Sequence, residues 1–196
     1  MKKIFLLSLL LFLQACSRPP APSVPPVPTA KELNQKMDQC LAMQKGESQV
    51  FGRFGKPGSG DDFGNWIVFK QADPDLVPYD SLSIWKRDDL QDVVLEATTP
   101  SGGWYRIDDY CFNKDNTIVG LYSDLRTFYG HVKVIRTWLY GANGETIKMD
   151  KKIFDLDTDK PINPDPNSYQ DDPPFLTSRL ENLLTEIELP ASLLTE

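Results

Sequence analysis

Residues 131–153, HVKVIRTWLYGANGETIKMDKKI, decide the fold class of this chain. The first ten residues mix valine, isoleucine, threonine, tryptophan and tyrosine, which are residue types that β-strands favour. Asn143-Gly144 then provides the strongest short signal for a hairpin turn. After the turn, Ile147 and Met149 alternate with charged residues, a pattern typical of a half-buried strand. The stretch therefore predicts two antiparallel strands joined by a tight turn.

The same pattern extends upstream to residue 65. Alternating apolar residues or aromatic-rich runs recur at Trp66–Lys70, Leu82–Ile84, Val93–Ala97, Trp104–Phe112 and Val119–Leu121. Short turn sequences separate the later runs, among them Ser101-Gly102-Gly103 and Asp115-Asn116. Because successive strands with tight turns are antiparallel neighbours, we predict a meander of about seven strands between residues 65 and 155.

Two helices are predicted to bracket these strands. Thr29 and Glu32 have the spacing of a capping box, in which each side chain accepts a hydrogen bond from the backbone of the other residue. Ser178 and Glu181 repeat that spacing near the end of the chain, and Pro190 then stops the second helix. The apolar residues that follow at helical spacing are Leu33, Met37, Cys40 and Leu41 in the first helix, and Leu180, Leu183, Leu184 and Ile187 in the second.

These elements predict a single α+β domain over residues 29–196, built mainly from an antiparallel β meander with an N-terminal and a C-terminal helix. We expect a curved sheet with both helices packed on one side. A half-barrel that closes around a cavity is the alternative. Two stretches fall outside the pattern: a glycine-rich loop at 52–64 and a loop rich in aspartate and proline at 156–175. Loops of this length in a compact domain are usually functional or mobile.

Residues 1–15 have the features of a signal peptide. Lys2 and Lys3 form a positive start, and the run Ile4–Leu13 is apolar except for Ser8. This run is shorter than the roughly 20 apolar residues that a transmembrane helix requires. The N-terminus therefore predicts export of the chain and removal of the first 15 residues.

Leu13-Gln14-Ala15-Cys16 resembles the lipobox of bacterial lipoproteins, in which a small residue precedes the cysteine that is lipidated. Gln14 is bulkier and more polar than the residue usual at its position. The resemblance covers residues 1–16 and implies that Cys16 becomes the first mature residue and carries acyl groups. Several acyl chains together give stable membrane anchoring. Since Ser17 is not the aspartate that retains such proteins at the inner membrane, we expect the outer membrane, with the domain facing the periplasm.

The segment between the anchor and the domain, residues 16–28, is a linker rich in proline. Proline runs favour an extended, semi-rigid chain. The whole sequence has 21 basic and 28 acidic residues, a formal net charge of −7, and loss of the two signal-peptide lysines makes it more negative. An acidic surface repels nucleic acid, so we expect no nucleic-acid partner.

The three cysteines divide into one anchor and one pair. With Cys16 bound to lipid, Cys40 and Cys111 remain in an oxidising compartment, and we predict a disulfide between them. Such a bond would close a loop of about 70 residues and stabilise the fold by roughly 4 kcal/mol in the chain-entropy model. Two buried free thiols are the alternative. A catalytic thiol would need a histidine partner, and the chain has a single histidine.

Candidate sites in the domain are sparse. Asp155, Asp157 and Asp159 have the spacing that opens a calcium loop, but Lys160 and Pro166 occupy the positions where an EF-hand needs glycine and glutamate. We therefore interpret this stretch as a solvated acidic loop, with a looser calcium site as the alternative. We expect no resident metal or other cofactor.

Acidic and aromatic side chains of the strands offer two further hypotheses. Asp108 and Asp109 are adjacent on a strand, so they point to opposite faces and cannot act together, and we expect one of them to be solvated. The tryptophans at 66, 85, 104 and 138 could line a sugar- or peptide-binding face, although core packing is the simpler interpretation.

The sequence thus favours a non-catalytic, membrane-anchored binding or envelope-assembly protein, not an enzyme. Its expected partners are the membrane, through the lipid, and an envelope protein or the cell wall. One alternative is a carrier of an apolar ligand in a half-barrel. The other is an envelope hydrolase that uses two carboxylates about 5–9 Å apart.

Overall fold

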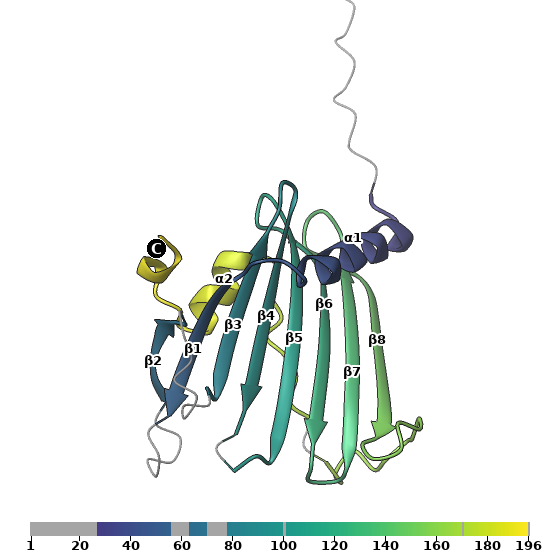
Figure 1. Ribbon diagram of the computed structural model, residues 1–196. Helices are drawn as coiled ribbons and strands as arrows, with labels where there is room; N and C mark the ends of the chain where they lie inside the picture. The colour runs from purple at the N-terminus through teal and green to yellow at the C-terminus, as the bar shows by residue number, and fades with distance from the viewer. Residues whose placement is uncertain (1–26, 56–62, 70–77, 100, 170, 196) are drawn as a thin grey trace, which may run out of the picture.

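The computed structural model describes residues 27–55, 63–69, 78–99, 101–169 and 171–195, and Figure 1 shows their arrangement. These residues form one eight-stranded antiparallel sheet, with a helix near each end of the chain. The strands are β1 (Gln49–Gly55), β2 (Phe63–Val68), β3 (Asp80–Lys86), β4 (Leu90–Thr98), β5 (Trp104–Asn113), β6 (Ile118–Thr127), β7 (Val132–Tyr140) and β8 (Thr146–Asp155). The helices are α1 (Ala30–Met43), α2 (Leu180–Glu186) and a closing 3-10 helix, η1 (Ala191–Thr195). The predicted α+β class, with one helix at each end, is confirmed.

The strand order is β2-β1-β3-β4-β5-β6-β7-β8, so β3 to β8 form the predicted meander. The prediction that the strands begin near residue 65 is wrong, because β1 starts at Gln49 and lies between β2 and β3. Glycines interrupt the apolar pattern of this strand and give it the composition of a loop. A Cβ on Gly52 would lie 2.9 Å from the ring of Phe54, which stacks on Phe69, so glycine makes room for this aromatic pair. Residues 56–62 of the predicted glycine-rich loop lie outside the described residues.

The sheet is open, with β2 and β8 as its two edges (Figure 1). β8 was expected to be half-buried, and this is wrong for most of its length. Ile147 and Met149 are 39% and 55% exposed, because β8 has a neighbour on one side only and its first residues have little cover. Alternation alone cannot tell an edge strand from a strand whose face is covered.

The two helices cover opposite faces of the sheet, which corrects the expectation that both pack on one side. Cys111 of β5 points toward α1, whereas its neighbours Tyr110 and Phe112 belong to the core under α2. We call these two sides the α1 face and the α2 face. The helical patterns of both segments were recognisable in sequence, but strands with apolar residues on both faces give each helix a separate surface to cover.

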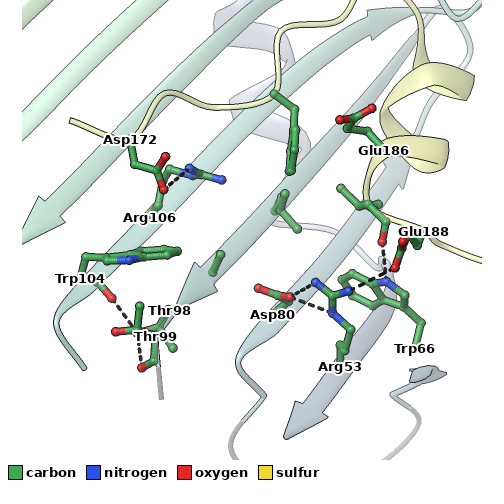
Figure 2. Close-up of a pocket in the computed structure, with 14 residues that line it drawn as sticks. Arg53, Trp66, Asp80, Thr98, Thr99, Trp104, Arg106, Asp172, Glu186 and Glu188 are labelled. Atoms are coloured by element: carbon green, nitrogen blue, oxygen red, sulfur yellow. Dashed lines mark hydrogen bonds and ion pairs between the residues drawn. The ribbon is translucent and has the colours of Figure 1, made fainter. Parts of the chain in front are cut away.

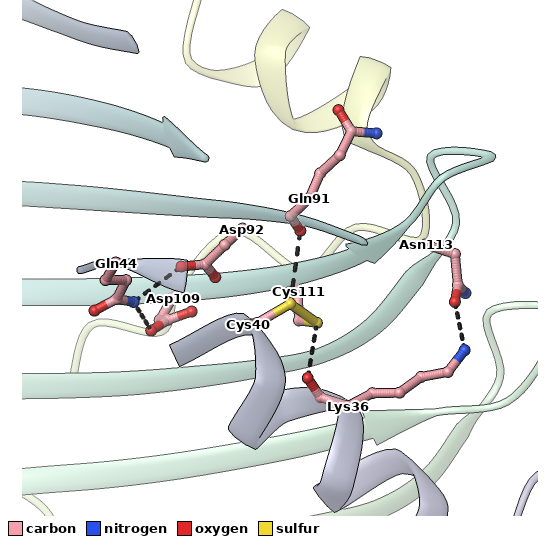
Figure 3. Close-up of a disulfide and its surroundings, with 8 residues drawn as sticks. All are labelled: Lys36, Cys40, Gln44, Gln91, Asp92, Asp109, Cys111 and Asn113. Atoms are coloured by element: carbon pink, nitrogen blue, oxygen red, sulfur yellow. Dashed lines mark hydrogen bonds between the residues drawn. A yellow bond between two sulfur atoms is a disulfide. The ribbon is translucent and has the colours of Figure 1, made fainter. Parts of the chain in front are cut away.

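α1 is held on its face by a small core and a covalent bond. The predicted capping box is present, with Thr29 N donating to Glu32 at 2.7 Å and Glu32 N donating to Thr29 Oγ1 at 3.3 Å. The buried residues of this core are Leu33, Met37, Cys40 and Met43 of the helix and Leu90, Cys111, Val119 and Leu139 of the sheet. Cys40 is disulfide-bonded to Cys111, with the Cα atoms 5.8 Å apart, so the predicted pair is confirmed (Figure 3).

The second predicted capping box is absent. α2 begins one residue later, with Arg179 as its N-cap, and no side chain caps it. Ser178 instead uses its backbone carbonyl to accept a hydrogen bond from Ile118 N, and Glu181 accepts one from Asn116. Both groups therefore join α2 to the turn between β5 and β6 rather than to the helix's own end.

The stretch from 156 to 179 runs from the end of β8 back across the α2 face to α2, and we call it the crossing segment (Figure 1). Asp171 forms ion pairs with Arg136 of β7 and Lys151 of β8. Further along, Tyr110 donates a hydrogen bond to the carbonyl of Phe175 at 3.1 Å. The described residues of this predicted loop thus contact three strands, β5, β7 and β8.

Candidate functional site

A pocket of about 280 Å³ lies on the α2 face, between β1–β5, the crossing segment and the end of α2 (Figure 2). Its floor is apolar and includes Leu95 and Ala97 of β4, which are both buried. Charged and aromatic side chains form its walls. Because α1 occupies the other side of the sheet, the pocket opens on the face opposite the helix that follows the N-terminal linker.

One wall combines Arg53 of β1, Trp66 of β2 and Asp80 of β3. Arg53 Nε donates to Asp80 Oδ2 at 2.9 Å, and the guanidinium lies over the indole of Trp66, 5.3 Å from the ring centroid. Trp66 is 5% exposed and donates its indole N–H to the carbonyl of Ile187 at 2.8 Å. This wall thus fixes the end of α2 against the edge of the sheet.

The opposite wall is centred on Arg106 of β5, whose side chain is 7% exposed. Its Nε lies 2.8 Å from Asp108 Oδ2, and its Nη1 donates to the carbonyl of Pro173 at 3.2 Å. The guanidinium lies 5.7 Å from the ring centroid of Trp104 and 6.0 Å from that of Phe175. Arg106 therefore joins β5 to the crossing segment and shapes the aromatic wall.

Asp108 is the buried counterion behind this wall. It is fully buried, receives a hydrogen bond from Ser123 Oγ at 2.7 Å, and pairs with Arg106. Burial raises the pKa of Asp108, and the charge of Arg106 opposes that rise. A carboxylate with these two partners serves to neutralise and orient Arg106, since it has no exposed surface through which to meet a ligand.

Three carboxylates surround the mouth of the pocket, and they come from separate segments. Asp172 of the crossing segment lies 3.6 Å from Arg106, with its side chain 43% exposed. Glu188 lies 4.0 Å from Arg53, and its side chain is 83% exposed. Glu186, at the end of α2, is also exposed. In Figure 2 Asp172 lies beside Arg106 at one end of the pocket, Glu188 lies near Arg53 at the other end, and Glu186 lies on α2.

A second group of buried polar residues lies on the α1 face, beside the disulfide (Figure 3). Gln44, which caps the end of α1, donates its side-chain N–H groups to Asp92 at 3.0 Å and to Asp109 at 2.7 Å. Burial raises the pKa of Asp109 to about 8, and the nearby Asp92 carboxylate contributes to the shift. Burial also raises the pKa of Asp92. The two carboxyl groups are 0% and 3% exposed, which leaves no route for a substrate to reach them.

The prediction that Asp108 and Asp109 point to opposite faces of the sheet is confirmed. The expectation that one of them is solvated is wrong, because Arg106 and Gln44 each supply a buried partner. Asp92 was missed as the partner of Asp109, since the strand LQDVVLEAT gives no sign that its aspartate points toward a helix end. Glu96, on an exposed position of β4, accepts a hydrogen bond from Tyr105 instead.

The candidate calcium residues are not brought together. Asp155 accepts hydrogen bonds from Thr158 N and Oγ1, which lower its pKa, while Asp159 pairs with Lys133. Asp157 is largely exposed and lies 3.6 Å from His131. No group of three or more potential metal ligands occurs among the described residues.

The four tryptophans separate into three environments. Trp66 and Trp104 line the pocket, whereas Trp138 is part of the core under α2. Trp85 lies on the α1 face and donates its indole N–H to the carbonyl of Gly46 at 3.1 Å. The arginines that stack on the pocket tryptophans were not singled out from the sequence, because strand alternation predicts neither their burial nor their pairing.

Cys16, the signal peptide and the linker up to residue 26 lie outside the described residues. Within the described ranges, no helix combines the length and apolar character needed to cross a membrane. Comparisons with protein-family models, with curated proteins and with solved structures found no match for this chain. The role proposed for the pocket therefore rests on the geometry of its own residues.

Proposed function

We propose that the protein is a non-catalytic binding protein of the bacterial envelope, anchored to the outer membrane through lipid on Cys16, with the pocket on the α2 face as its binding site. The observation that carries the proposal is the pocket itself, in which an apolar floor is enclosed by two arginine–tryptophan pairs and a rim of carboxylates. A concave, partly apolar site with a few placed polar groups is the usual form of a ligand site.

The charged groups of the pocket support binding rather than catalysis. Arg53 and Arg106 are held by Asp80 and Asp108, so their positions are fixed before any ligand arrives. Fixed polar groups reduce the conformational entropy that binding costs. The buried carboxyl pair Asp92 and Asp109 would suit acid–base chemistry by its raised pKa values, but a general acid or base must reach its substrate.

The lipid anchor supports an envelope location, and the placement of the pocket agrees with it. The anchor precedes the linker, and the linker leads into α1 on one face of the sheet, whereas the pocket opens on the other face. A tether on one face and a binding site on the other leaves the site accessible to partners in the periplasm. The charged walls and the open sheet argue against the alternative of an apolar carrier.

The anchor and the binding role have separate tests. Mass spectrometry of the mature protein should find acyl groups on Cys16, and Cys16→Ser should release the protein from the membrane fraction. The purified lipidated protein should then sediment with cell-wall sacculi and leave their composition unchanged. Digestion of the sacculi that is abolished by Asp109→Asn, or by substitutions in the pocket, would show a hydrolase and contradict the binding role.

A further inference from the structure

The charges in the pocket point to a particular ligand chemistry, which rests on the proposed binding function. Both pocket arginines, the half-buried Arg53 and the buried Arg106, are already paired with carboxylates. Arg53 makes two hydrogen bonds to Asp80, and Arg106 contacts Asp108, Asp172 and the carbonyl of Pro173. An anionic ligand would have to displace these carboxylates, so the arginines are poorly placed to attract one.

The groups that stay near solvent at the mouth are acidic. Asp172, Glu186 and Glu188 come from the crossing segment, α2 and the residues after α2, and all three line the pocket. The two nearest cations lie 3.6 Å and 4.0 Å away, and each is engaged more closely by another carboxylate. The chain as a whole is also acidic, with a formal net charge of −7. The field at the opening therefore favours a cation.

Below this rim the pocket is apolar. Leu95 and Ala97 form the floor, while Trp104 and Phe175 are partly exposed at the side. Phe175 is 36% exposed and offers ring surface to a ligand, whereas Trp66 is covered by Arg53 and has almost no exposed surface. Since Arg106 already lies 5.7 Å from the ring centroid of Trp104 and 6.0 Å from that of Phe175, these rings offer a ligand apolar surface rather than a free cation-binding face.

From this arrangement we infer that the pocket binds an alkylammonium group, such as the side chain of a lysine. The methylene chain packs on Leu95, Ala97 and Phe175, and the ammonium group meets the carboxylates of Glu186 and Glu188 at the end of α2, while Asp172 stays beside Arg106 on the opposite wall. The volume of about 280 Å³ accommodates one such side chain and excludes a folded element. A neutral sugar is a weaker fit, because Arg53 covers the ring of Trp66 and Arg106 lies over that of Trp104.

The test uses the mature lipidated chain in detergent micelles and records the indole N–H resonances of its tryptophans. The probes are N-acetyl-lysine amide, the uncharged N-acetyl-norleucine amide, N-acetyl-glutamate amide and a neutral chito-oligosaccharide. The lysine probe should shift the Trp104 resonance and leave that of Trp85, on the far face, in place. Its affinity should fall as salt is raised, because ions screen exposed charges.

Variants distinguish the effect of the acidic residues at the pocket mouth from the effect of the chain's overall negative charge. Glu186→Gln combined with Glu188→Gln should weaken lysine binding about 3- to 10-fold, the size expected for two exposed ion pairs. Trp104→Leu should weaken it as well. The matched controls are Asp38→Asn, an exposed acid on α1, and Trp85→Leu, and both should bind the lysine probe as the parent does.

Equal binding of the lysine and norleucine probes would overturn the inference, as would tighter binding of the glutamate probe or the sugar at Trp104. If no probe moves Trp104 while the protein still sediments with sacculi, the ligand class is wrong and the proposed binding function stands. If the protein does not sediment with sacculi either, both proposals fail.

Discussion

At the residue scale, the buried carboxyl pair beside α1 makes a prediction about pH. The pKa of Asp109 is raised to about 8 from its usual 3.8, first by burial and then by Asp92. The folded protein therefore holds a proton that the unfolded chain releases above its own pKa. Stability is greatest below the unfolded pKa and declines as pH rises toward the folded value, where the carboxyl group finally ionises.

Asp109→Asn should remove much of this decline, because asparagine keeps an acceptor for Gln44 and carries no charge. We expect the variant to match the parent near pH 4 and to be more stable at pH 8 by about 1–3 kcal/mol, the scale on which an unfavourable buried charge acts. Denaturant unfolding at several pH values measures this difference. Asp150→Asn, at an exposed acid on β8, serves as the control. Parallel stability curves for parent and Asp109→Asn would contradict the assignment.

Gly120 of β6 makes a second prediction at this scale, which concerns how closely α1 approaches the sheet. A Cβ at this position would lie 2.5 Å from Met37 Sδ and 3.0 Å from the carbonyl of Trp138. Gly120→Ala should therefore destabilise the fold by about 1–3 kcal/mol, the usual cost of overpacking. The loss should be smaller in a Met37→Ala background, because the thioether that the new methyl group meets is then gone. Equal losses in both backgrounds, measured by denaturant unfolding, would show that the helix does not limit this position.

At the element scale, the sequence predicts which residues form most strands and helices, but not which face of the sheet each helix covers. Val93, Leu95 and Ala97 alternate cleanly on β4 and were recognised, because each faces the α2 core. β1 does not show a strand pattern, since Gly52 replaces a side chain there and makes room for the ring of Phe54, which stacks on Phe69. The sequence does not predict the face that each helix covers, because apolar residues at helical spacing show only that one side of the helix is buried. Long-range pairing is the information that local patterns lack.

The element-scale prediction concerns α1, which is held to the sheet by the disulfide and by a small apolar core. Replacing Cys40 and Cys111 together by serine should lower the free energy of unfolding by about 4 kcal/mol, according to the chain-entropy model for a loop of this size. Hydrogen exchange should accelerate first in α1, while β4–β7 keep their protection from the core under α2. Addition of reductant to the parent protein should give the same pattern. Uniform loss of protection across the sheet would mean that α1 belongs to the main folding unit.

At the scale of the whole molecule, the pocket shows what a single sequence could and could not reveal. Trp66 and Trp104 are recognisable in sequence as candidates for a binding face, but the acidic residues Asp172, Glu186 and Glu188 that line the same pocket follow Trp66 by more than 100 residues. Prolines and aspartates give the crossing segment the composition of a loop. Its ion pairs are visible only in the structure, where Asp171 lies beside Arg136 of β7 and Asp172 beside Arg106 of β5. The segment thus gives Arg136 its ion pair and adds a second carboxylate at Arg106, which Asp108 already neutralises.

The crossing segment therefore makes the prediction for the whole molecule: it is part of the domain and not an appendage. A chain that stops after Asp155 loses α2, the ion pair of Arg136 and the second carboxylate at Arg106, and it uncovers the core formed by Tyr110, Phe112 and Leu121. Burial of that core is a main source of stability, so we expect the truncated chain to lose its near-ultraviolet circular dichroism and to bind a hydrophobic dye.

A milder variant separates the ion pairs from the apolar cover. Asp171→Asn with Asp172→Asn keeps every apolar contact of the segment but removes the ion pair of Arg136 and one of the two carboxylates at Arg106, which keeps Asp108. Because the side chains of Asp171 and Asp172 are 35% and 43% exposed, solvent screens both pairs, and this variant should fold with a melting temperature lowered by the loss of about 1 kcal/mol. Asp165→Asn, in an exposed turn of the same segment, should leave the melting temperature unchanged. A truncated chain as stable as the parent would show instead that the sheet and α1 suffice, and that the segment serves only to build the pocket.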